Sequence, residues 1–203
     1  MRTRLLLLTD RSQLRLGRGL VRTVSECAAA GLEVVVVREH DLPPPQRSAL
    51  IRELAGIPGL TVISSRIPDL AAQGVHAASC NAELPPLPGG PGSGDAYLTP
   101  RYMRGRSCHT PLEVYDAAAA GIDYVTLSPY AESASKPGYG PALGPAAFAG
   151  EWPVPVYALG GIDPTNAAQA RDAGAHGVAV MGAVMRAERP AAVVEALLRE
   201  VDR

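Results

Sequence analysis

The feature that most constrains the fold is a regular alternation of short apolar runs and helical patterns along all 203 residues. The apolar runs are rich in valine, leucine and isoleucine, as expected of strands that are covered on both faces. We predict eight strands, near residues 4–9, 33–38, 60–64, 74–77, 103–107, 123–128, 154–159 and 177–181. Helical patterns lie near residues 17–30, 45–56, 67–73, 111–120, 143–149, 164–173 and 189–202. Strands that alternate with helices indicate a parallel sheet built from repeated βα units.

Eight such units predict an α/β fold, a single-domain (β/α)8 TIM barrel over residues 1–203. The chain is shorter than the roughly 250 residues typical of this fold, so its loops must be short. One unit departs from the pattern, because the stretch ELPPLPGGPGSGDAYLTP is too rich in proline and glycine for a long helix. We expect the fourth helix to be shortened or replaced by this loop, with an active-site lid as the alternative. The loop at 128–144, which follows the sixth strand, is the stronger lid candidate.

Composition excludes several classes of function. A net charge of −1 gives no reason to expect nucleic acid or an anionic membrane as partner. Cys27, Cys80 and Cys108 lie far apart without a CxxC pair, which favours reduced thiols over a disulfide framework or a zinc site. The first apolar run ends at Asp10 and Arg11, too early for a signal peptide or a membrane span. We expect a cytoplasmic protein, and its association into homo-oligomers stays open.

Two strands near the C-terminus end in glycine. The run VPVYALGGI reaches Gly160 and Gly161, and the run GVAVMGA contains Met181 and Gly182. Backbone without a Cβ can approach an oxyanion closely, and its N–H groups can donate to a phosphate beside a helix start. One such strand end is often only a turn, but two in succession favour a phosphate site. A phosphorylated small molecule is therefore the expected ligand.

Polar side chains follow the other predicted strands, and in a barrel these strand ends share one face. Arg38 follows the run VVVV, and its guanidinium is the best cation for a phosphate or a carboxylate. Glu39 is either the salt-bridge partner of Arg38 or a base that contacts the substrate. Lys136, the single lysine, is either a solvated loop charge or a ligand contact. Further substrate-binding candidates at strand ends are Ser64, His76, Ser107 and Ser128.

Three histidines, His40, His76 and His109, lie within one or two residues of strand ends. Histidine titrates near neutrality, so each is able to transfer a proton. A lone histidine is more often structural, but three that face one barrel mouth favour contact of at least one with the ligand. His176 lies in the turn GAHG at the opposite face, so we assign it to the surface.

Taken in order, six segments of the chain resemble the thiamine phosphate synthase and TenI superfamily, which consists of single-domain barrels of this length. The segments are LLLLTDRS, VVVREH, VISSRIPDLAAQGVH, GRSCHTPLEVYDAAAAGIDYVTLSPY, ALGGI and GVAVMGA. The resemblance covers nearly the whole chain and is specific for the superfamily, not for one activity. It implies either of two reactions. The synthase joins an aminopyrimidine pyrophosphate to a thiazole phosphate with magnesium, whereas the TenI branch aromatises a carboxythiazole phosphate tautomer by proton transfer.

The chain departs from the synthase pattern at the pyrimidine half of the site. The resemblance implies a glutamine and a lysine around the arginine of the second strand, where this chain has Val36 and His40. It implies an Asn-Asp pair where Ser64 and Ser65 stand, and an acidic ligand where Asn81 stands. Magnesium prefers carboxylate oxygens, so we expect no metal. General acid/base chemistry also needs no redox cofactor, and we expect none.

The thiazole half keeps Gly160-Gly161 and Met181-Gly182, which we call the glycine pairs. It also keeps the Ser107 and His109 unit and Lys136. This is the TenI pattern, although the TenI branch has a histidine where Pro129 stands. We therefore predict thiazole tautomerase chemistry on a thiazole phosphate, with His109 as the proton-transfer residue and His40 as second choice. The alternatives are a thiamine phosphate synthase and a non-catalytic protein that binds thiazole phosphate or thiamine phosphate as a carrier or regulator.

Overall fold

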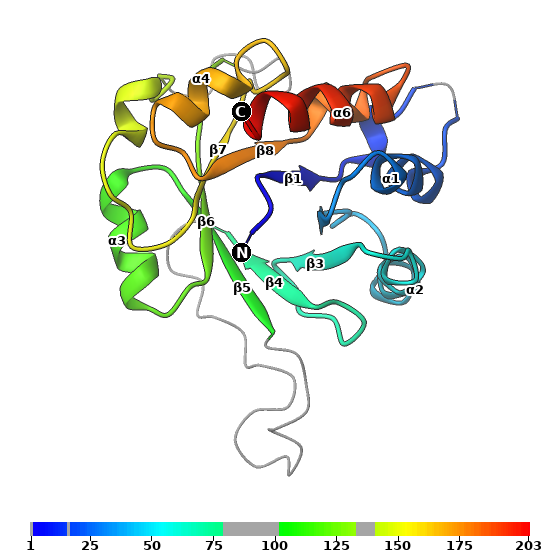
Figure 1. Ribbon diagram of the computed structural model, residues 1–203. Coiled ribbons are helices and arrows are strands. Elements are labelled where there is room, and N and C mark those ends of the chain that lie inside the picture. The colour runs from blue at the N-terminus through cyan, green and yellow to red at the C-terminus, as the bar shows by residue number, and fades with distance from the viewer. Residues whose placement is uncertain (1, 16, 79–101, 133–140) are drawn as a thin grey trace.

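The computed structural model of this protein describes residues 2–15, 17–78, 102–132 and 141–203. Eight parallel strands close into a barrel, in which each strand pairs with the next and β8 pairs with β1 (Figure 1). The strands are β1 (Leu5–Leu8), β2 (Val34–Val37), β3 (Thr61–Ser65), β4 (Gly74–Ala77), β5 (Met103–Cys108), β6 (Tyr124–Leu127), β7 (Val156–Leu159) and β8 (Gly177–Val180). All eight lie where the sequence predicts a strand, so the predicted (β/α)8 barrel is confirmed.

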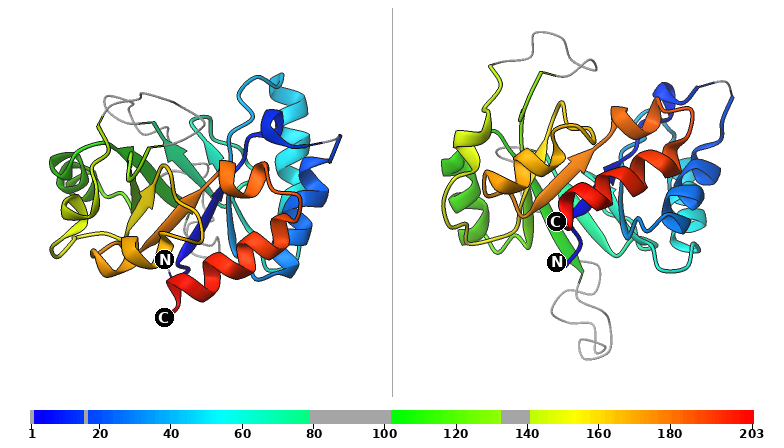
Figure 2. Two further views of the ribbon diagram at one scale, coloured as in Figure 1. Left: turned by 90° about the horizontal axis from the view of Figure 1, so that it is seen from above. Right: turned by 45° about the horizontal axis from the view of Figure 1, so that its top comes forward.

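Helices cover the outside of the strands, as two further views also show (Figure 2). They are α1 (Leu20–Ala29), α2 (Pro44–Ala55), α3 (Pro111–Ala119), α4 (Ala167–Asp172), α5 (Gly182–Met185) and α6 (Pro190–Val201), with short 3-10 turns η1 (Arg11–Gln13) and η2 (Pro145–Phe148). Helix α6 packs beside α1, next to the seam where β8 pairs with β1. In the part of the chain that the structure describes, no helix has the length and apolarity to cross a membrane.

The predicted helix over 67–73 is wrong. This stretch is a turn in which Asp69 accepts hydrogen bonds from two backbone N–H groups, those of Ala71 to Oδ1 at 2.9 Å and Ala72 to the carbonyl at 3.1 Å. An aspartate that bonds its own neighbouring backbone in this way competes with helix formation. The connection between β3 and β4 therefore carries no helix.

Two other helix predictions differ in extent or cannot be compared, and one short helix was not predicted. The pattern at 143–149 forms only the single 3-10 turn η2, and the sequence pattern does not predict α5. The predicted change in the fourth helix falls on residues 79–101, which lie outside the described residues.

Side chains of the strands alternate between two apolar layers. Leu5 and Leu7 face the outer layer between strands and helices, whereas Leu6 and Leu8 face the barrel interior. Tyr124 and Tyr157 also fill the interior, with their rings edge to face and their centroids 5.9 Å apart. A packed interior leaves the carboxyl ends of the strands as the place for a ligand.

His176 is not a simple surface residue, contrary to the sequence-based assignment. Its ring packs against Tyr157, with 5.3 Å between ring centroids, and its Nδ1 lies 2.9 Å from Nη1 of Arg4. Burial, together with Arg4 and Arg171, lowers the pKa of His176 to about 4, so the ring is neutral at pH 7. It belongs to the packing of the amino-terminal face.

Candidate active site

A cavity of about 860 Å³ opens at the carboxyl ends of the strands. Its volume lies within the range of roughly 300 to 1,000 Å³ that small-molecule sites occupy. The cavity brings together ten of the residues predicted from strand ends. They are Arg38, His40, His76, Ser107, His109, Ser128, Gly160, Gly161, Met181 and Gly182.

The first glycine pair adopts backbone conformations that side chains rarely allow. Gly160 and Gly161 have φ angles of 100° and 65°. A Cβ on Gly161 would lie 2.8 Å from the Cβ of Ala131, closer than such atoms approach in proteins. The strand end after β7 therefore requires glycine, and its backbone lines the cavity with no side chain in between.

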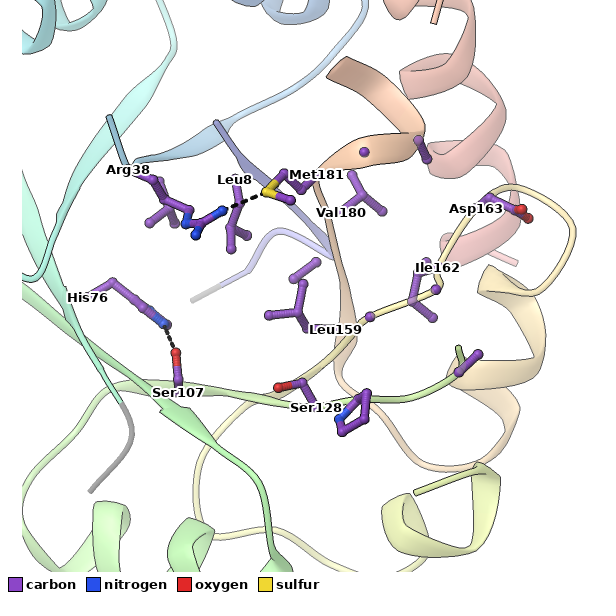
Figure 3. A pocket seen from close by; sticks show the side chains of 18 of the residues that line it. Leu8, Arg38, His76, Ser107, Ser128, Leu159, Ile162, Asp163, Val180 and Met181 are labelled. Atoms are coloured by element: carbon purple, nitrogen blue, oxygen red, sulfur yellow. Dashed lines mark hydrogen bonds between the residues drawn. The ribbon is translucent and has the colours of Figure 1, made fainter. Parts of the chain in front are cut away.

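Arg38 extends its guanidinium across the cavity toward β8. Its Nη1 lies 2.7 Å from Sδ of Met181 (Figure 3). Its backbone N–H donates to Oγ1 of Thr9 at 3.0 Å. In the same view His76 lies on the side of Arg38, whereas Ile162 and Asp163 lie on the opposite side of the cavity. The guanidinium of Arg38 therefore lies close to Met181, which precedes Gly182 after β8.

His76 connects the barrel interior with the cavity. It is buried, and its Nδ1 lies 3.1 Å from the hydroxyl of Tyr124 while its Nε2 lies 3.0 Å from Oγ of Ser107. Burial above all, and then Arg38, lowers the pKa of His76 to about 4, so the ring is neutral at pH 7. Gly105 permits this contact, since a Cβ there would lie 2.6 Å from Nδ1.

The direction of these bonds follows from their burial. If Tyr124 donates to Nδ1, then Nε2 carries the ring proton and donates to Ser107. The opposite direction would leave the phenolic hydrogen without the acceptor that it has in His76, and a buried unpaired donor is costly. We therefore assign the Nε2–H form of His76. The hydroxyl hydrogen of Ser107 then remains available to donate to a ligand.

His109 is held at the start of α3. Thr110 caps this helix by accepting the N–H of Glu113, and the carboxylate of Glu113 accepts the N–H of His109 at 2.6 Å. Nδ1 of His109 lies 2.9 Å from the carbonyl oxygen of Ser128. Because a carbonyl only accepts, Nδ1 carries the proton in the neutral ring and Nε2 has the basic lone pair.

His40 is exposed at the rim of the cavity. Burial and the charges of Arg66, Arg47 and Arg38 lower its pKa below the ordinary value. The lowered pKa favours the uncharged ring, which suits the role of a base better than that of an acid.

Two predicted substrate-binding residues, Glu39 and Ser64, bond to other parts of the protein and do not line the cavity. Glu39 is buried, and its carboxylate accepts from the backbone N–H of Arg11 at 3.1 Å and from its guanidinium at 2.9 Å. Ser64 donates to the carbonyl of Ile67 and accepts from Arg47 at 3.0 Å. Glu39 thus forms the salt bridge that the sequence left open, although with Arg11. Lys136 lies outside the described residues.

Arg47 of α2 holds the ends of β2 and β3 together. Its buried guanidinium donates to the carbonyls of Val37 at 2.9 Å and Ser65 at 3.0 Å. Desolvation lowers the pKa of Arg47, whereas Asp69 and Glu39 oppose this effect. These bonds fix the backbone from which Arg38 and the residues after Ser65 enter the cavity.

Sequence reasoning missed Arg186 as a cavity residue and gave Arg66 no role. Both line the cavity, and Arg66 has a φ angle of 64°, which is uncommon outside glycine. The signal for Arg186 was its position four residues after Gly182, one helical turn away.

Among the described residues, the donor set at the ends of β3 and β4 does not fit magnesium. Ser65 and His76 line this part of the cavity, and Asn81 lies outside the described residues. Within the described ranges, no three His, Cys, Asp or Glu side chains gather in a way that would hold a metal ion. Magnesium prefers hard carboxylate oxygens, and the hydroxyl of Ser65 and the imidazole of His76 supply none.

Comparison with known proteins assigns the family. The chain matches the thiamine monophosphate synthase family, TMP-TENI, over residues 5–184. It is 34% identical over 209 residues to the thiamine-phosphate synthase of Haloarcula marismortui, covering 96% of this chain and 95% of that protein. It is 32% identical over 212 residues to the thiamine-phosphate synthase of Nostoc sp., covering 100% of this chain but only 57% of that protein.

The chain also covers only 37% of the bifunctional ThiM/ThiE protein of Symbiobacterium thermophilum, to which it is 36% identical. It thus spans about half the length or less of these two longer relatives. A thiamine phosphate pyrophosphorylase structure from Pyrococcus furiosus has the same fold, with a TM-score of 0.77, 22% identity and coverage of 98% of this chain and 95% of that one. By sequence, this chain belongs to the thiamine monophosphate synthase family.

Proposed function

We propose that this protein is a transferase that couples two phosphorylated heterocycles, as the name thiamine-phosphate synthase of its relatives implies. In this reaction the ring nitrogen of a thiazole phosphate attacks the methylene carbon of an aminopyrimidine pyrophosphate. A C–N bond forms, the C–O bond to the pyrophosphate breaks, and the bonding pair leaves with the pyrophosphate. We also propose that residues 1–203 act as one barrel domain.

The observation that carries this proposal is that three arginines and two glycine-containing strand ends line one cavity. Arg38 and Arg66 enter it after β2 and β3, and the glycine pairs with Arg186 enter it after β7 and β8. A tautomerase acts on one phosphate ester, whereas coupling requires a site for a phosphate and a site for a pyrophosphate. Three guanidinium groups in one cavity lining, those of Arg38, Arg66 and Arg186, support the second reaction.

The residues of this chain would then act by binding and by charge. Arg38 and Arg66 would stabilise the negative charge that develops on the leaving pyrophosphate, because a guanidinium offers paired N–H donors to phosphate oxygens. Ser107, oriented by His76, would donate its hydroxyl hydrogen to the same group. The backbone of Gly160, Gly161 and Gly182 would hold the thiazole phosphate.

The test is formation of thiamine phosphate from the two purified substrates, separated by chromatography and detected by fluorescence after oxidation. We expect product with the wild-type protein. Arg38→Gln should lower kcat by about 100-fold, the scale of one preorganised charged donor. Arg52→Gln, on α2 and away from the cavity lining, is the matched control. Absence of product under all conditions would refute the coupling reaction.

Thiazole tautomerisation is the second candidate, and the geometry of His109 favours it. Its Nε2 has a basic lone pair because Nδ1 is bonded to the carbonyl of Ser128, and the residue lines the cavity. A base in this position suits proton removal from a thiazole tautomer. Solvent exchange of the thiazole proton, followed by NMR without the pyrimidine substrate, separates this reaction from coupling.

A further inference from the structure

Arg186 is a cavity residue that the sequence motifs do not account for. We propose that Arg186 contacts the phosphate ester of the substrate and makes the cavity selective for the doubly charged phosphate over the dephosphorylated alcohol. The inference rests on the proposed function in one respect, namely that a phosphate ester binds at the strand ends of β7 and β8. It adds a specificity-determining side chain to a cradle otherwise built of backbone.

The guanidinium of Arg186 lies directly over Gly182. A Cβ built on Gly182 would lie 2.5 Å from Nη2 and 2.6 Å from Cζ of Arg186, so the guanidinium occupies the space that a side chain would take. Residues four apart on a helix lie on the same face, and their side chains point toward the helix N-terminus. Glycine at 182 therefore allows the arginine to fold back onto the strand end that lines the cavity.

A chain of hydrogen bonds from the other end of the sequence holds this guanidinium in place. Nη1 of Arg186 donates to Oε1 of Gln13, and Nε2 of Gln13 donates to Oδ2 of Asp10 at 2.6 Å. A guanidinium only donates and a carboxylate only accepts, so the two contacts fix which way the Gln13 amide points. Asp10 is itself fixed by Ser12, whose N–H donates to Oδ1 at 3.1 Å.

This arrangement positions a cation before any ligand arrives. A guanidinium carries five N–H donors in a planar fork, so the bond from Nη1 to Gln13 is compatible with further bonds to a phosphate. The fork matches the geometry of phosphate oxygens, and a preorganised cation loses less side-chain entropy on binding. Asp163 also lines the cavity, and its Oδ1 accepts a hydrogen bond from the backbone N–H of Thr165 at 2.7 Å.

Because Arg186 is charged, phosphate affinity should depend on salt in a way that backbone donors alone do not predict. Neutral N–H groups bind a phosphate with little dependence on salt, whereas attraction to a partly exposed cation weakens as ionic strength rises. The affinity for a phosphate ester should therefore depend on salt in the wild-type protein and less so without Arg186.

The test is calorimetry with three probes, namely inorganic phosphate, thiazole phosphate and the thiazole alcohol without its phosphate. Arg186→Gln should raise Kd for both phosphate probes by about 10- to 100-fold, the range expected for a hydrogen bond to a charged group. Its Kd for the alcohol should equal that of the wild type. Gly182→Ala should give the same pattern, since its Cβ displaces the guanidinium. Arg189→Gln, an exposed position at the start of α6, is the control.

Two results would overturn the inference. One is an unchanged Kd for phosphate in Arg186→Gln, and the other is an equal loss of affinity for the alcohol, which would mean that Arg186 only shapes the cavity. Thermal unfolding of each variant shows whether it is folded. If inorganic phosphate requires Arg186 but thiazole phosphate does not compete with it, the role of Arg186 holds while the proposed coupling function fails.

Discussion

The burial of His76 predicts that protein stability falls in mildly acidic solution. The ring has a pKa of about 4 in the folded protein against an ordinary value of 6.5. Between these two values the unfolded chain binds a proton that the folded protein does not bind, so stability rises with pH in this window. The contribution is complete above pH 6.5 and is lost as the pH falls toward 4.

The size of the effect follows from the two pKa values. At a pH of about 5 the unfolded histidine is almost fully protonated and the folded one only about one tenth, which corresponds to about 2 kcal/mol relative to pH 7.5. His76→Gln removes the titration and keeps an amide able to reach Tyr124 and Ser107. We expect the variant to lose about 2 kcal/mol less than the wild type over this interval.

Urea unfolding measures this difference. The single tryptophan, Trp152, is partly buried and donates to the carbonyl of Phe148 at 3.0 Å, so its fluorescence reports unfolding. Only the change between the two pH values is compared, which cancels any constant cost of the substitution. The other histidines, His176 included, titrate in both proteins and cancel as well. An equal pH dependence in wild type and His76→Gln would show that His76 is not a buried neutral group.

Three further outcomes are expected. Gly161→Val should abolish phosphate binding measured by calorimetry, because its φ angle of 65° and its contact with Ala131 exclude a side chain, whereas Gly19→Ala, with a φ of −74° and open space around it, should bind normally. Turnover should be unaffected by a magnesium chelator, because Ser65 supplies no carboxylate, and a strict magnesium requirement would contradict this assignment of the donor set. His109→Asn should slow thiazole proton exchange by about 100-fold if tautomerisation occurs, and unchanged exchange in both His109→Asn and His40→Asn would remove the mechanism.

The strands were predictable because each is a short apolar run whose identity does not depend on distant residues. Val34–Val37 reads as a buried strand in any context. The helices were less predictable than the strands where local polar contacts decide the conformation. The backbone bonds of Asp69 turn a helical pattern into a loop, and α5 is too short, at Gly182–Met185, to show a helical period.

The candidate site was predictable to the extent that it consists of strand ends. Barrel topology alone brings Arg38, His76 and His109 to one cavity. The orientation of a side chain depends instead on partners that are remote in sequence. Glu39 turns to Arg11, 28 residues away, and Arg186 is held by Gln13, 173 residues away. No pattern along the chain encodes such pairs.

The bonds made by Arg47 give an outer helix a part in ligand selection. Helix α2 contributes no residue to the cavity lining, yet its arginine reaches the carbonyls that precede Arg38 and Arg66. A shift of α2 along the barrel wall would therefore move both of these cations together. Exchange of α2 between relatives should alter substrate preference even if every cavity residue is left as it is.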